Sequence, residues 1–339
     1  MQNISCQNHW RDRTVFVTGA TGLVGSWLVK ELLELGANVV ALVREKSRQS
    51  ILNHDGLLSR IVTVNESLVD SPAIQSVLDD HSVQAIFHLA SQSLVGLAKD
   101  DPLGTLEANV RGTWSILEAA RQAGVRQVVI ASSYKAYGAS EYLPFRETHP
   151  LRGMYPYDCS KVCTDLISTM YAKNYGVPVG IVRCANVFGG GDLNFSRMIP
   201  DLVCSTLRGQ RFVIRSDGKF VRDFLFVKDA VSAYLRLAEH LATNPDIAGE
   251  AFNFSMEEQV TVLDIADMIL RLMGRSDLAP EIQNGASAET REQYMVCDKA
   301  RETLGWEPRY TLQQGLHETI DWYAGFLGEK YSAATAARG

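Results

Sequence analysis

Short apolar runs alternate with stretches of helical periodicity through the first half of the chain. The runs predict strands at 14–18, 39–43, 61–64, 85–89, 128–132 and 179–183. Between them, the spacing of apolar positions predicts helices at 25–35, 73–80, 102–123 and 156–175. Because the runs are apolar almost throughout, we expect both faces of the sheet to be covered. The alternation therefore predicts an α/β fold with a doubly wound parallel sheet of the Rossmann type.

The pattern changes after residue 186, where consecutive glycines, scattered prolines and short mixed elements follow. A strand-like run at 222–227 and a helix at 229–242 return to the earlier pattern. We therefore expect a second, smaller mixed α/β domain that is interleaved with the first and binds the substrate. The expected parts are 1–186 for the dinucleotide-binding domain with 220–245 packing back on it, 187–330 mainly for the substrate domain, and 331–339 as a tail.

Composition and charge narrow the class of protein. The 339 residues include 33 Lys or Arg and 39 Asp or Glu, a formal net charge of -6, so nucleic acid is not expected as a partner. No segment approaches the roughly 18 apolar residues of a membrane span, and residues 1–13 are polar. We therefore expect no membrane association and a cytoplasmic location. The six cysteines form no C-x-x-C pair, so neither a bound metal nor a disulfide framework is expected.

The first predicted strand leads through a glycine-rich turn into a helix. Gly19, Gly22 and Gly25 follow the spacing G-x-x-G-x-x-G in this turn. Such glycines allow a sharp turn, let a pyrophosphate approach the backbone and let helix and strand pack closely, while the helix N-terminus attracts the anion. Glycines alone also suit an ordinary tight turn, but their position between a strand and a helix favours a dinucleotide site.

The residue at the end of the second strand bears on the choice of cofactor. A carboxylate there would bind the ribose 2′-hydroxyl of NAD, whereas an arginine would favour the 2′-phosphate of NADP. The chain has Arg44 followed by Glu45. Because Arg44 could contact a phosphate, stack on adenine or remain a solvated loop charge, we predict NAD as the cofactor and keep NADP as the alternative.

A tyrosine and a lysine lie four residues apart in the helix predicted at 156–175. This spacing places Tyr157 and Lys161 on one helix face, where the ammonium is expected to lower the pKa of the phenol. The tyrosine could then act as general base on a sugar hydroxyl while hydride passes to a nicotinamide. Ser133 follows the strand at 128–132 and is expected to share the substrate proton, whereas Ser132 is expected to be structural.

These motifs together resemble a known family. The resemblance rests on Gly19–Gly25, His88–Ala90, Asn109–Thr113, Ser132–Ser133, Tyr157–Lys161 and Arg222–Phe224. From about residue 12 to about residue 325 the chain is similar to the extended short-chain dehydrogenase/reductases, specifically the sugar-nucleotide epimerases and dehydratases. Within that family it resembles the CDP-glucose 4,6-dehydratases most, through Ser26–Leu28, Gly189–Asp192 and Leu304–Arg309.

The resemblance implies a reaction and a set of binding residues. The C4 hydroxyl of a nucleotide-bound hexose would be oxidised, and the 4-keto sugar would stay bound. The implied cofactor contacts are Gly19, Thr21, Gly22, Leu23, Val24, Gly25, Arg44, Leu89, Ala90, Ser91, Asn109, Tyr157 and Lys161. The implied substrate contacts are Gln92 and Ser93 near the sugar or nicotinamide, Ser133 at the reacting hydroxyl, Asn186 and Arg222 at the diphosphate, and Asn194, Phe195 and Arg197 at the base.

Positions 133 to 135 separate the subfamilies. Dehydratases of this family carry a hydroxyl residue, an acid that protonates the departing C6 oxygen, and a Glu or Lys that removes the C5 proton. The chain has Ser133, Tyr134 and Lys135 there, so the base is present but a tyrosine replaces the expected aspartate. A 4-epimerase needs neither group and usually has small residues beside the serine. We predict a 4,6-dehydratase of the CDP-glucose type, with a 4-epimerase acting on a UDP-hexose or UDP-uronic acid as the alternative.

Two further interpretations concern turnover and assembly. A sensor that binds the cofactor without turnover is the alternative of another class, but such sensors generally lose the Tyr and Lys that this chain has. The helices at 102–123 and 156–175 resemble those that form a four-helix interface between two subunits of the family. The resemblance therefore implies a homodimer.

Overall fold

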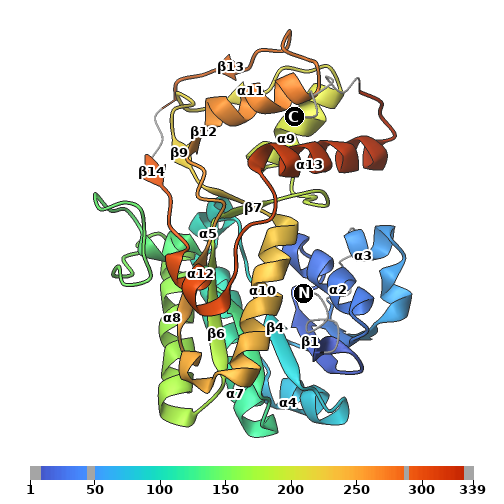
Figure 1. The fold of residues 1–339 in the computed structure, drawn as a ribbon, viewed down its shortest axis with the longest axis vertical. Coiled ribbons are helices and arrows are strands. Elements are labelled where there is room, and N and C mark those ends of the chain that lie inside the picture. The colour runs from blue at the N-terminus through green and yellow to red at the C-terminus, as the bar shows by residue number, and fades with distance from the viewer. Residues whose placement is uncertain (1–8, 44–49, 286–289, 332–339) are drawn as a thin grey trace.

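The computed structural model describes residues 9–43, 50–285 and 290–331, and seven strands of this part form one parallel sheet (Figure 1). The strand order is β11-β6-β5-β4-β1-β2-β3, and every neighbouring pair is parallel. The strands are β1 (Thr14–Thr18), β2 (Asn38–Leu42), β3 (Val62–Val64), β4 (Ala85–His88), β5 (Gln127–Ala131), β6 (Val179–Cys184) and β11 (Ala251–Phe254). This order reverses direction between β1 and β4, as in the doubly wound Rossmann fold, which confirms the predicted fold class.

Helices cover both faces of the sheet because successive strand residues point to opposite sides. Val15 and Val17 belong to one core cluster together with residues of α2 (Leu23–Glu34) and α10 (Val227–Thr243). Phe16, between them, belongs to the other core cluster. That cluster includes residues of α4 (Ser71–Asp80), α7 (Gly112–Ala123) and α8 (Pro156–Tyr175). The apolar runs of the sequence therefore reflect burial on two sides.

The helix predicted at 102–123 is interrupted. It consists of α6 (Pro102–Leu106), a π-helical segment at Glu107–Arg111 and then α7. Asn109 lies in the π-helical segment and is buried, and its side chain bonds to other elements of the molecule. Such wide turns are frequent at functional sites. The other short elements before α8 are α3 (Ile51–His54), η1 (Leu57–Arg60), α5 (Val95–Asp100) and η3 (Tyr134–Tyr137).

Two features beyond residue 186 differ from the sequence-based expectation. The large sheet contains β11, which the apolar pattern did not reveal. The strand predicted at 222–227 is divided at Asp223 into β9 (Val221–Arg222) and β10 (Phe224–Phe226). The division occurs because the Asp223 carboxylate accepts hydrogen bonds from Ser255 Oγ at 2.5 Å and Met295 N at 3.1 Å, so the chain passes from one small sheet to another.

The remaining described elements form a smaller layered region, seen in the upper part of Figure 1. Three small sheets occur there, with orders β10-β7, β12-β9-β14 and β13-β8. Their further strands are β7 (Asn186–Phe188), β8 (Val213–Ile214), β12 (Val260–Thr261), β13 (Glu281–Ile282) and β14 (Glu292–Gln293). The helices are α9 (Met198–Leu207), α11 (Val262–Leu272) and α13 (Leu312–Leu327), while α12 (Asp298–Leu304) lies against β11.

Glycines after β7 let the chain pass between the two regions. A Cβ atom at Gly190 would lie 2.3 Å from the ring of Trp322 on α13, and one at Gly191 would lie 1.8 Å from Ile51. The carbonyl of Gly190 also accepts a hydrogen bond from Trp27 Nε1 at 2.8 Å. Side chains larger than hydrogen are therefore excluded where helices of both regions meet.

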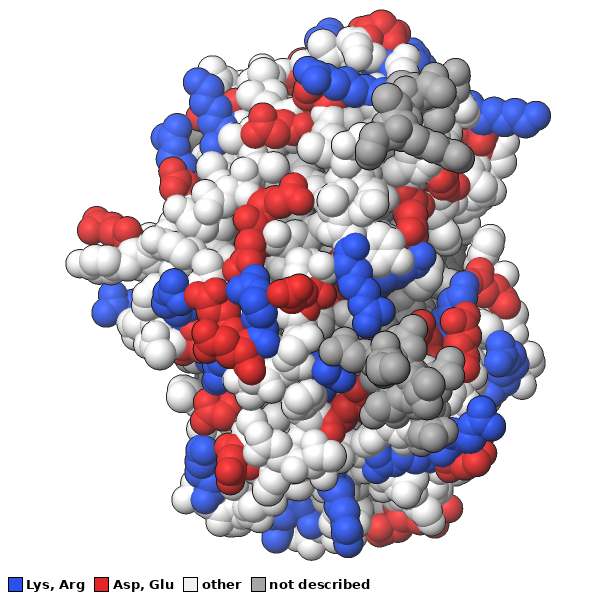
Figure 2. All heavy atoms as spheres, viewed as in Figure 1, with Lys and Arg blue, Asp and Glu red and all other residues white. Residues whose placement is uncertain are grey.

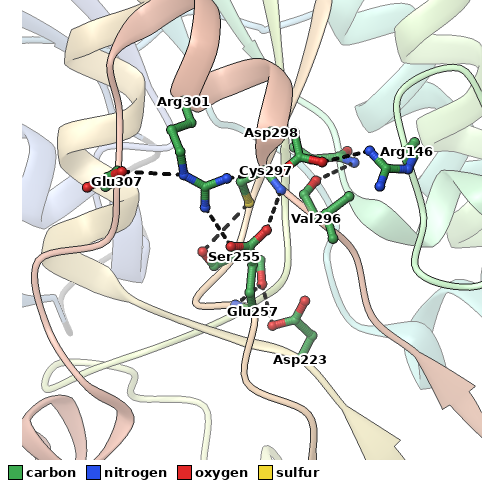
Figure 3. Close-up of polar contacts among 10 residues, drawn as sticks. Arg146, Asp223, Ser255, Glu257, Val296, Cys297, Asp298, Arg301 and Glu307 are labelled. Atoms are coloured by element: carbon green, nitrogen blue, oxygen red, sulfur yellow. Dashed lines mark hydrogen bonds and ion pairs between the residues drawn. The ribbon is translucent and has the colours of Figure 1, made fainter.

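A second junction lies at the start of α12 and is drawn in Figure 3. Glu257 accepts a hydrogen bond from the backbone N–H of Cys297 at 2.8 Å and forms an ion pair with Arg301 at 2.6 Å. Arg301 also contacts Asp298 and Glu307. The segment between β11 and β12 is thereby tied to α12.

Charges of both signs are interspersed over the face shown in Figure 2. Within the described ranges, no helix is long and apolar enough to cross a membrane. The same residues contain no group of three or more His, Cys, Asp or Glu side chains that could hold a metal ion.

Candidate active site

The candidate site lies where β1, β4 and β5 end. These strands are neighbours in the parallel sheet, so their carboxyl ends lie along one edge. The glycine turn follows β1, residues 89–93 follow β4, and Ser133 follows β5. The switch point of the strand order lies between β1 and β4, which is where such folds bind dinucleotides.

The glycine turn fits a dinucleotide. Gly19 has a φ of +70°, and a Cβ there would lie 2.6 Å from Ala90 N, so only glycine lets the turn approach the end of β4. A Cβ at Gly25 would lie 2.1 Å from the carbonyl oxygen of Gly19, so this glycine lets α2 pack against the turn. Gly22 is exposed at the N-cap of α2 and has no side-chain cap. The N-terminal amides of a 12-residue helix therefore face the place expected for the pyrophosphate.

The other predicted cofactor residues surround this turn. Thr21, Leu23 and Val24 flank Gly22 at the start of α2, and all three are partly exposed. Leu89, Ala90 and Ser91 follow β4, where the amides of Leu89 and Ala90 donate hydrogen bonds to the backbone oxygen and Oγ1 of Thr18. Arg44 lies outside the described residues.

His88 at the end of β4 is a buried structural group. Its Nδ1 lies 2.7 Å from Thr18 Oγ1, and its Nε2 lies 3.4 Å from Thr113 Oγ1. Burial, helped by the nearby charge of Lys161, lowers the pKa of His88 to about 3. The imidazole is therefore neutral at physiological pH and links β1 to α7.

The structure brings together Tyr157, Lys161 and Ser133. The first two lie one turn apart in α8, with Lys161 Nζ 5.9 Å from the centre of the Tyr157 ring. The Tyr157 phenol hydrogen-bonds with the Ser133 side chain. Lys161 is buried and donates a hydrogen bond to the carbonyl of Ala131 at 2.8 Å, at the end of β5. The serine, the phenol and the ammonium thus meet at the edge of the sheet.

The expected lowering of the Tyr157 pKa is wrong for this structure. Although the residue is partly exposed, burial of the phenol raises its pKa to about 12, and the hydrogen bond to Ser133 and the charge of Arg197 only partly oppose this. Burial also lowers the pKa of Lys161 to about 8, against the attraction of Asp165. Desolvation outweighs the neighbouring charges because both groups lie in a poorly hydrated environment.

The sequence did not predict a role for Asp165 or Arg183. These two residues form a buried ion pair, and the charge of Asp165 acts on Lys161. Asp165 follows Lys161 by one helical turn, accepts a hydrogen bond from Ser132 Oγ and pairs with Arg183 at 2.6 Å. Ser132 is therefore a structural residue, since it fixes the end of β5 to α8. The four-residue spacing from Lys161 was a signal for Asp165, but the strand residue Arg183 had no local signal.

The side chains of Asn109 and Gln92 form hydrogen bonds with neighbouring protein groups. Asn109 Oδ1 accepts from Gln92 N at 2.7 Å, and Asn109 Nδ2 donates to Gln92 O at 3.0 Å and Ser160 Oγ at 2.9 Å. The Gln92 side chain contacts Leu94 and Thr105. The two residues fix the loop after β4 to the start of α8, close to the predicted nicotinamide position.

Tyr134 and Lys135 follow Ser133 in η3. The Tyr134 ring is fully buried, and its hydroxyl accepts a hydrogen bond from Asn186 Nδ2 at 2.8 Å. Lys135 is partly exposed, with its Nζ 5.4 Å from the centre of the Tyr134 ring and 2.5 Å from Gln293 Oε1 on β14. Both side chains therefore extend from the sheet edge toward the smaller region.

Arg197 crosses between the two regions. Its guanidinium pairs with Asp192 at 2.9 Å and donates to Ser93 Oγ at 3.0 Å in the loop after β4. Its charge also acts on Tyr157, so Arg197 lies nearer the catalytic pair than a position at the base would suggest. Phe195 is 42% exposed, and Asn194 caps a local turn through Ser196.

The two predicted diphosphate residues lie on neighbouring parts of the small sheets. Asn186 Nδ2 contacts the backbone oxygen of Asp223 as well as Tyr134. Arg222 is buried, donates to the backbone oxygens of Val221 and Arg291, and has its guanidinium carbon 5.2 Å from the centre of the Phe220 ring. The guanidinium is thus held by protein contacts beside β14.

The fold and the site together define a class of protein. A Rossmann sheet with a glycine turn that fits a pyrophosphate carries a serine, a tyrosine and a lysine at the adjoining strand and helix. These are the features of a dinucleotide-dependent enzyme that moves a proton and a hydride.

The NAD dependent epimerase/dehydratase family matches residues 15–254, and the chain belongs to this family. It is therefore an NAD-dependent enzyme of the sugar-nucleotide dehydratase and epimerase group, and NAD is its cofactor. The named relatives are enzymes, so the alternative of a non-catalytic sensor has no support.

Relatives from both reaction classes match at a similar level. CDP-glucose 4,6-dehydratase of Salmonella typhimurium is 31% identical over 340 residues, covering 95% of this chain and 93% of the relative. UDP-glucose 4-epimerase of Mycolicibacterium smegmatis is 31% identical over 318 residues, covering 91% of this chain and 97% of the relative. The solved UDP-glucose 4-epimerase of Thermotoga maritima with UDP-glucose gives a TM-score of 0.84 at 27% identity, covering 93% of this chain and 99% of that one.

Proposed function

We propose that the enzyme is a sugar-nucleotide 4,6-dehydratase of the CDP-glucose type. The observation that carries this proposal is the pair of large side chains, Tyr134 and Lys135, directly after Ser133 at the reacting edge. The ammonium of Lys135 lies between the Tyr134 ring and Gln293, and we propose this lysine as the base for the C5 proton. An enzyme that only rotates a keto sugar needs room at this place.

Each catalytic residue then has a defined task. NAD supplies the hydride acceptor when it is bound. Tyr157 in its phenolate form removes the proton of the C4 hydroxyl. Burial raises the pKa of this phenol to about 12 without the cofactor, and the positive charge of a bound oxidised nicotinamide would favour the phenolate. Ser133 shares the proton through its contact with the phenol, and Lys161 holds a positive charge beside the Tyr157 ring. Lys135 removes the C5 proton next to the new ketone.

The substrate is proposed to lie between the sheet edge and the small sheets. Arg222 and Asn186 are the proposed diphosphate contacts, while Phe195 offers an exposed ring to the base. Arg197 and Ser93 are proposed near the sugar, since their contact joins the two sides close to Tyr157. This arrangement keeps the proposed division into a dinucleotide-binding part and a smaller substrate-binding part.

A 4-epimerase is the second candidate. The position of the usual aspartate acid is occupied by Tyr134, whose hydroxyl already accepts a hydrogen bond from Asn186. The relatives and solved structures also include UDP-glucose 4-epimerases. An epimerase would use Tyr157, Ser133 and Lys161 in the same way but break no bond at C5.

Incubation with CDP-, UDP-, GDP- and dTDP-hexoses and uronic acids, followed by mass spectrometry, tests the proposal. Loss of one water supports the dehydratase, and an isomer of unchanged mass supports the epimerase. Tyr157→Phe should lower turnover by about a hundredfold to ten-thousandfold while bound NAD remains. Turnover close to the wild-type rate would remove Tyr157 from the catalytic residues.

We also propose that two copies of the chain form a homodimer. Large apolar side chains are exposed on neighbouring helices, namely Leu103 and Leu106 on α6, Trp114 on α7, and Leu166 and Met170 on α8. Monomers rarely leave such a contiguous apolar face uncovered, and a two-fold axis would pair it with itself. Leu166→Glu should halve the mass measured by light scattering, whereas Val62→Glu, outside this face, should not.

We propose that the enzyme is located in the cytoplasm. The five cysteines of the described residues are all free thiols, and reduced thiols are typical of that compartment. Fractionation of the producing cell with an antibody against the chain tests this location.

A further inference from the structure

Asp158 is a buried residue whose carboxyl group has no hydrogen-bonding or ion-pair partner among the described residues. It follows the catalytic Tyr157 in the first turn of α8 and is only 6% exposed. None of the hydrogen bonds or ion pairs among the described residues includes its carboxylate, and it does not cap its helix. Buried carboxylates are normally hydrogen-bonded or paired, so this isolation needs an explanation.

The Asp158 carboxyl keeps access to open space. Within the described part of the chain, the unpaired side-chain atoms that are fully enclosed are Gln127 Oε1 and Ser168 Oγ. The Asp158 oxygens are not among them. The backbone of Gly153 packs on the base of the side chain, because a Cβ atom at Gly153 would lie 2.8 Å from Asp158 Cβ. The side chain is thus fixed at its Cβ atom while its carboxyl group is not fully enclosed.

Two of the proposed catalytic residues interact electrostatically with Asp158. Lys135 on η3 is the charge that acts on the carboxyl, and the carboxyl in turn acts on the Tyr157 phenol. Gly153 and Arg152 donate backbone hydrogen bonds to Ala136 O, so the loop before α8 is fixed against η3. Asp158 therefore follows the proposed C4 base directly in α8, and the loop packed against it is bonded to η3, which carries the proposed C5 base.

Elimination needs an acid that the three-residue motif does not supply. The usual aspartate position is occupied by Tyr134, whose ring is enclosed in the core and whose hydroxyl is bonded to Asn186. An acid must hold a proton near neutral pH. Burial, partly opposed by Lys135, raises the pKa of Asp158 to about 6, so a fraction of this carboxyl is protonated there.

We propose that Asp158 is the general acid that protonates the departing C6 oxygen, in place of the aspartate missing at position 134. This inference rests on the proposed dehydratase function. Lys135 removes the proton from C5, and the electrons of that C–H bond form the C5=C6 double bond as the C6–O bond breaks. Asp158 gives its proton to the leaving hydroxyl, which departs as water. The bound cofactor would supply the hydride that adds to C6, and Lys135 returns its proton to C5. Tyr157 then holds the proton of the C4 hydroxyl while Asp158 has lost one, so the passage of one proton through solvent from Tyr157 to Asp158 restores the site.

The test compares the NAD-loaded wild type with Asp158→Asn and Tyr134→Phe, in D₂O, on the sugar nucleotide that the wild type dehydrates. Asparagine matches the shape of aspartate but carries no acidic proton. For Asp158→Asn we expect bound NADH absorbance to appear and deuterium to enter C5, while water loss falls by about a hundredfold to ten-thousandfold. Asp158→Glu should restore part of the water loss.

The outcomes separate the acid from a structural role. Water loss by Asp158→Asn within about threefold of wild type overturns the proposal, because a general acid contributes far more than that. Equal loss of NADH formation, C5 exchange and water release also overturns it, since a damaged site fails at every step. If Tyr134→Phe alone stops water release, Tyr134 is the acid. If the wild type yields only C4 isomers, the dehydratase function fails first and Asp158 has no leaving group to protonate.

Discussion

The carboxylate of Asp165 lies 2.6 Å from Arg183 Nη2, and the two side chains are 3% and 7% exposed. The pair joins α8, which carries Tyr157 and Lys161, to β6 of the large sheet. Arg183 also donates to Tyr137 Oη at 2.8 Å, and that phenol donates to Asn253 on β11 at 2.7 Å. Buried polar contacts therefore connect the catalytic helix α8 to β11, the last strand of the large sheet in chain order.

Asp165→Asn should be strongly destabilising because it leaves the Arg183 charge buried without its partner. Breaking one side of a buried ion pair typically costs about 3–5 kcal/mol. Urea unfolding of the NAD-free protein measures the loss. Asp267→Asn is the matched control, since its partner Arg271 lies one turn away on the surface of α11, and it should change stability by less than about 1 kcal/mol. Similar losses in the two variants would show that the buried pair contributes no more than a surface pair.

Gly25→Ala should abolish NAD binding. The new Cβ would lie 2.1 Å from the carbonyl oxygen of Gly19, so α2 would have to move away from the turn that holds the pyrophosphate. Gly325→Ala is the control, because a Cβ there meets nothing within 4 Å on α13. That change should stabilise the protein by about 0.5–1 kcal/mol through helix propensity. Calorimetric titration with NAD that gives wild-type affinity for Gly25→Ala would contradict the assigned role of the turn.

His88 should make the fold sensitive to mild acid. Its pKa is lowered from 6.5 to about 3 by burial, so below pH 6.5 the unfolded chain binds a proton that the folded chain does not. Its contribution to stability is therefore complete above pH 6.5 and is lost as the pH falls toward 3, at about 1.4 kcal/mol per pH unit. From pH 7 to pH 5 the loss should be about 2 kcal/mol.

Unfolding free energies at several pH values measure this slope. His88→Gln removes the titrating group, so its stability should depend less on pH than that of the wild type, even if its absolute stability is lower. Equal slopes for wild type and His88→Gln would show that His88 does not cause the acid sensitivity.

Local sequence patterns predicted the large sheet and the catalytic pair Tyr157 and Lys161. Both depend on residues that are close together in the sequence. The strands β1, β2, β4, β5 and β6 are apolar runs buried on two faces, whereas the edge strand β3 is largely exposed. Tyr157 and Lys161 are separated by one helical turn. The glycine spacing is also local, since Gly25 packs on Gly19 within one βα unit, although Gly19 itself packs on Ala90 at the end of β4.

Features that depend on packing between distant segments could not be predicted in this way. β11 is four residues long and includes Asn253, a polar residue that is buried only because Tyr137, Phe145 and Val296 surround its amide. The lack of a partner for Asp158 likewise depends on which hydrogen-bond donors the tertiary structure brings near it. The spacing of residues along the chain does not predict this. The predicted lowering of the Tyr157 pKa was wrong for the same reason, because desolvation is a property of the packed site.

Glu257 has a φ of +58° in the segment between β11 and β12. This left-handed conformation is unfavourable for residues with a Cβ by about 1–2 kcal/mol. The carboxylate nevertheless accepts from Cys297 N at 2.8 Å and pairs with Arg301 at 2.6 Å, so these contacts offset the strain (Figure 3). Glu257→Ala loses both contacts and keeps the strain, whereas Glu257→Gly loses the contacts but relieves the strain. We therefore expect the glycine variant to be more stable than the alanine variant by about 1 kcal/mol, and both to be less stable than wild type.

Urea midpoints of wild type, Glu257→Ala and Glu257→Gly, measured under identical conditions, give the order of stability. An alanine variant as stable as the glycine variant would show that the backbone relaxes at this position, and two variants as stable as wild type would show that the contacts to Cys297 and Arg301 add nothing to the fold.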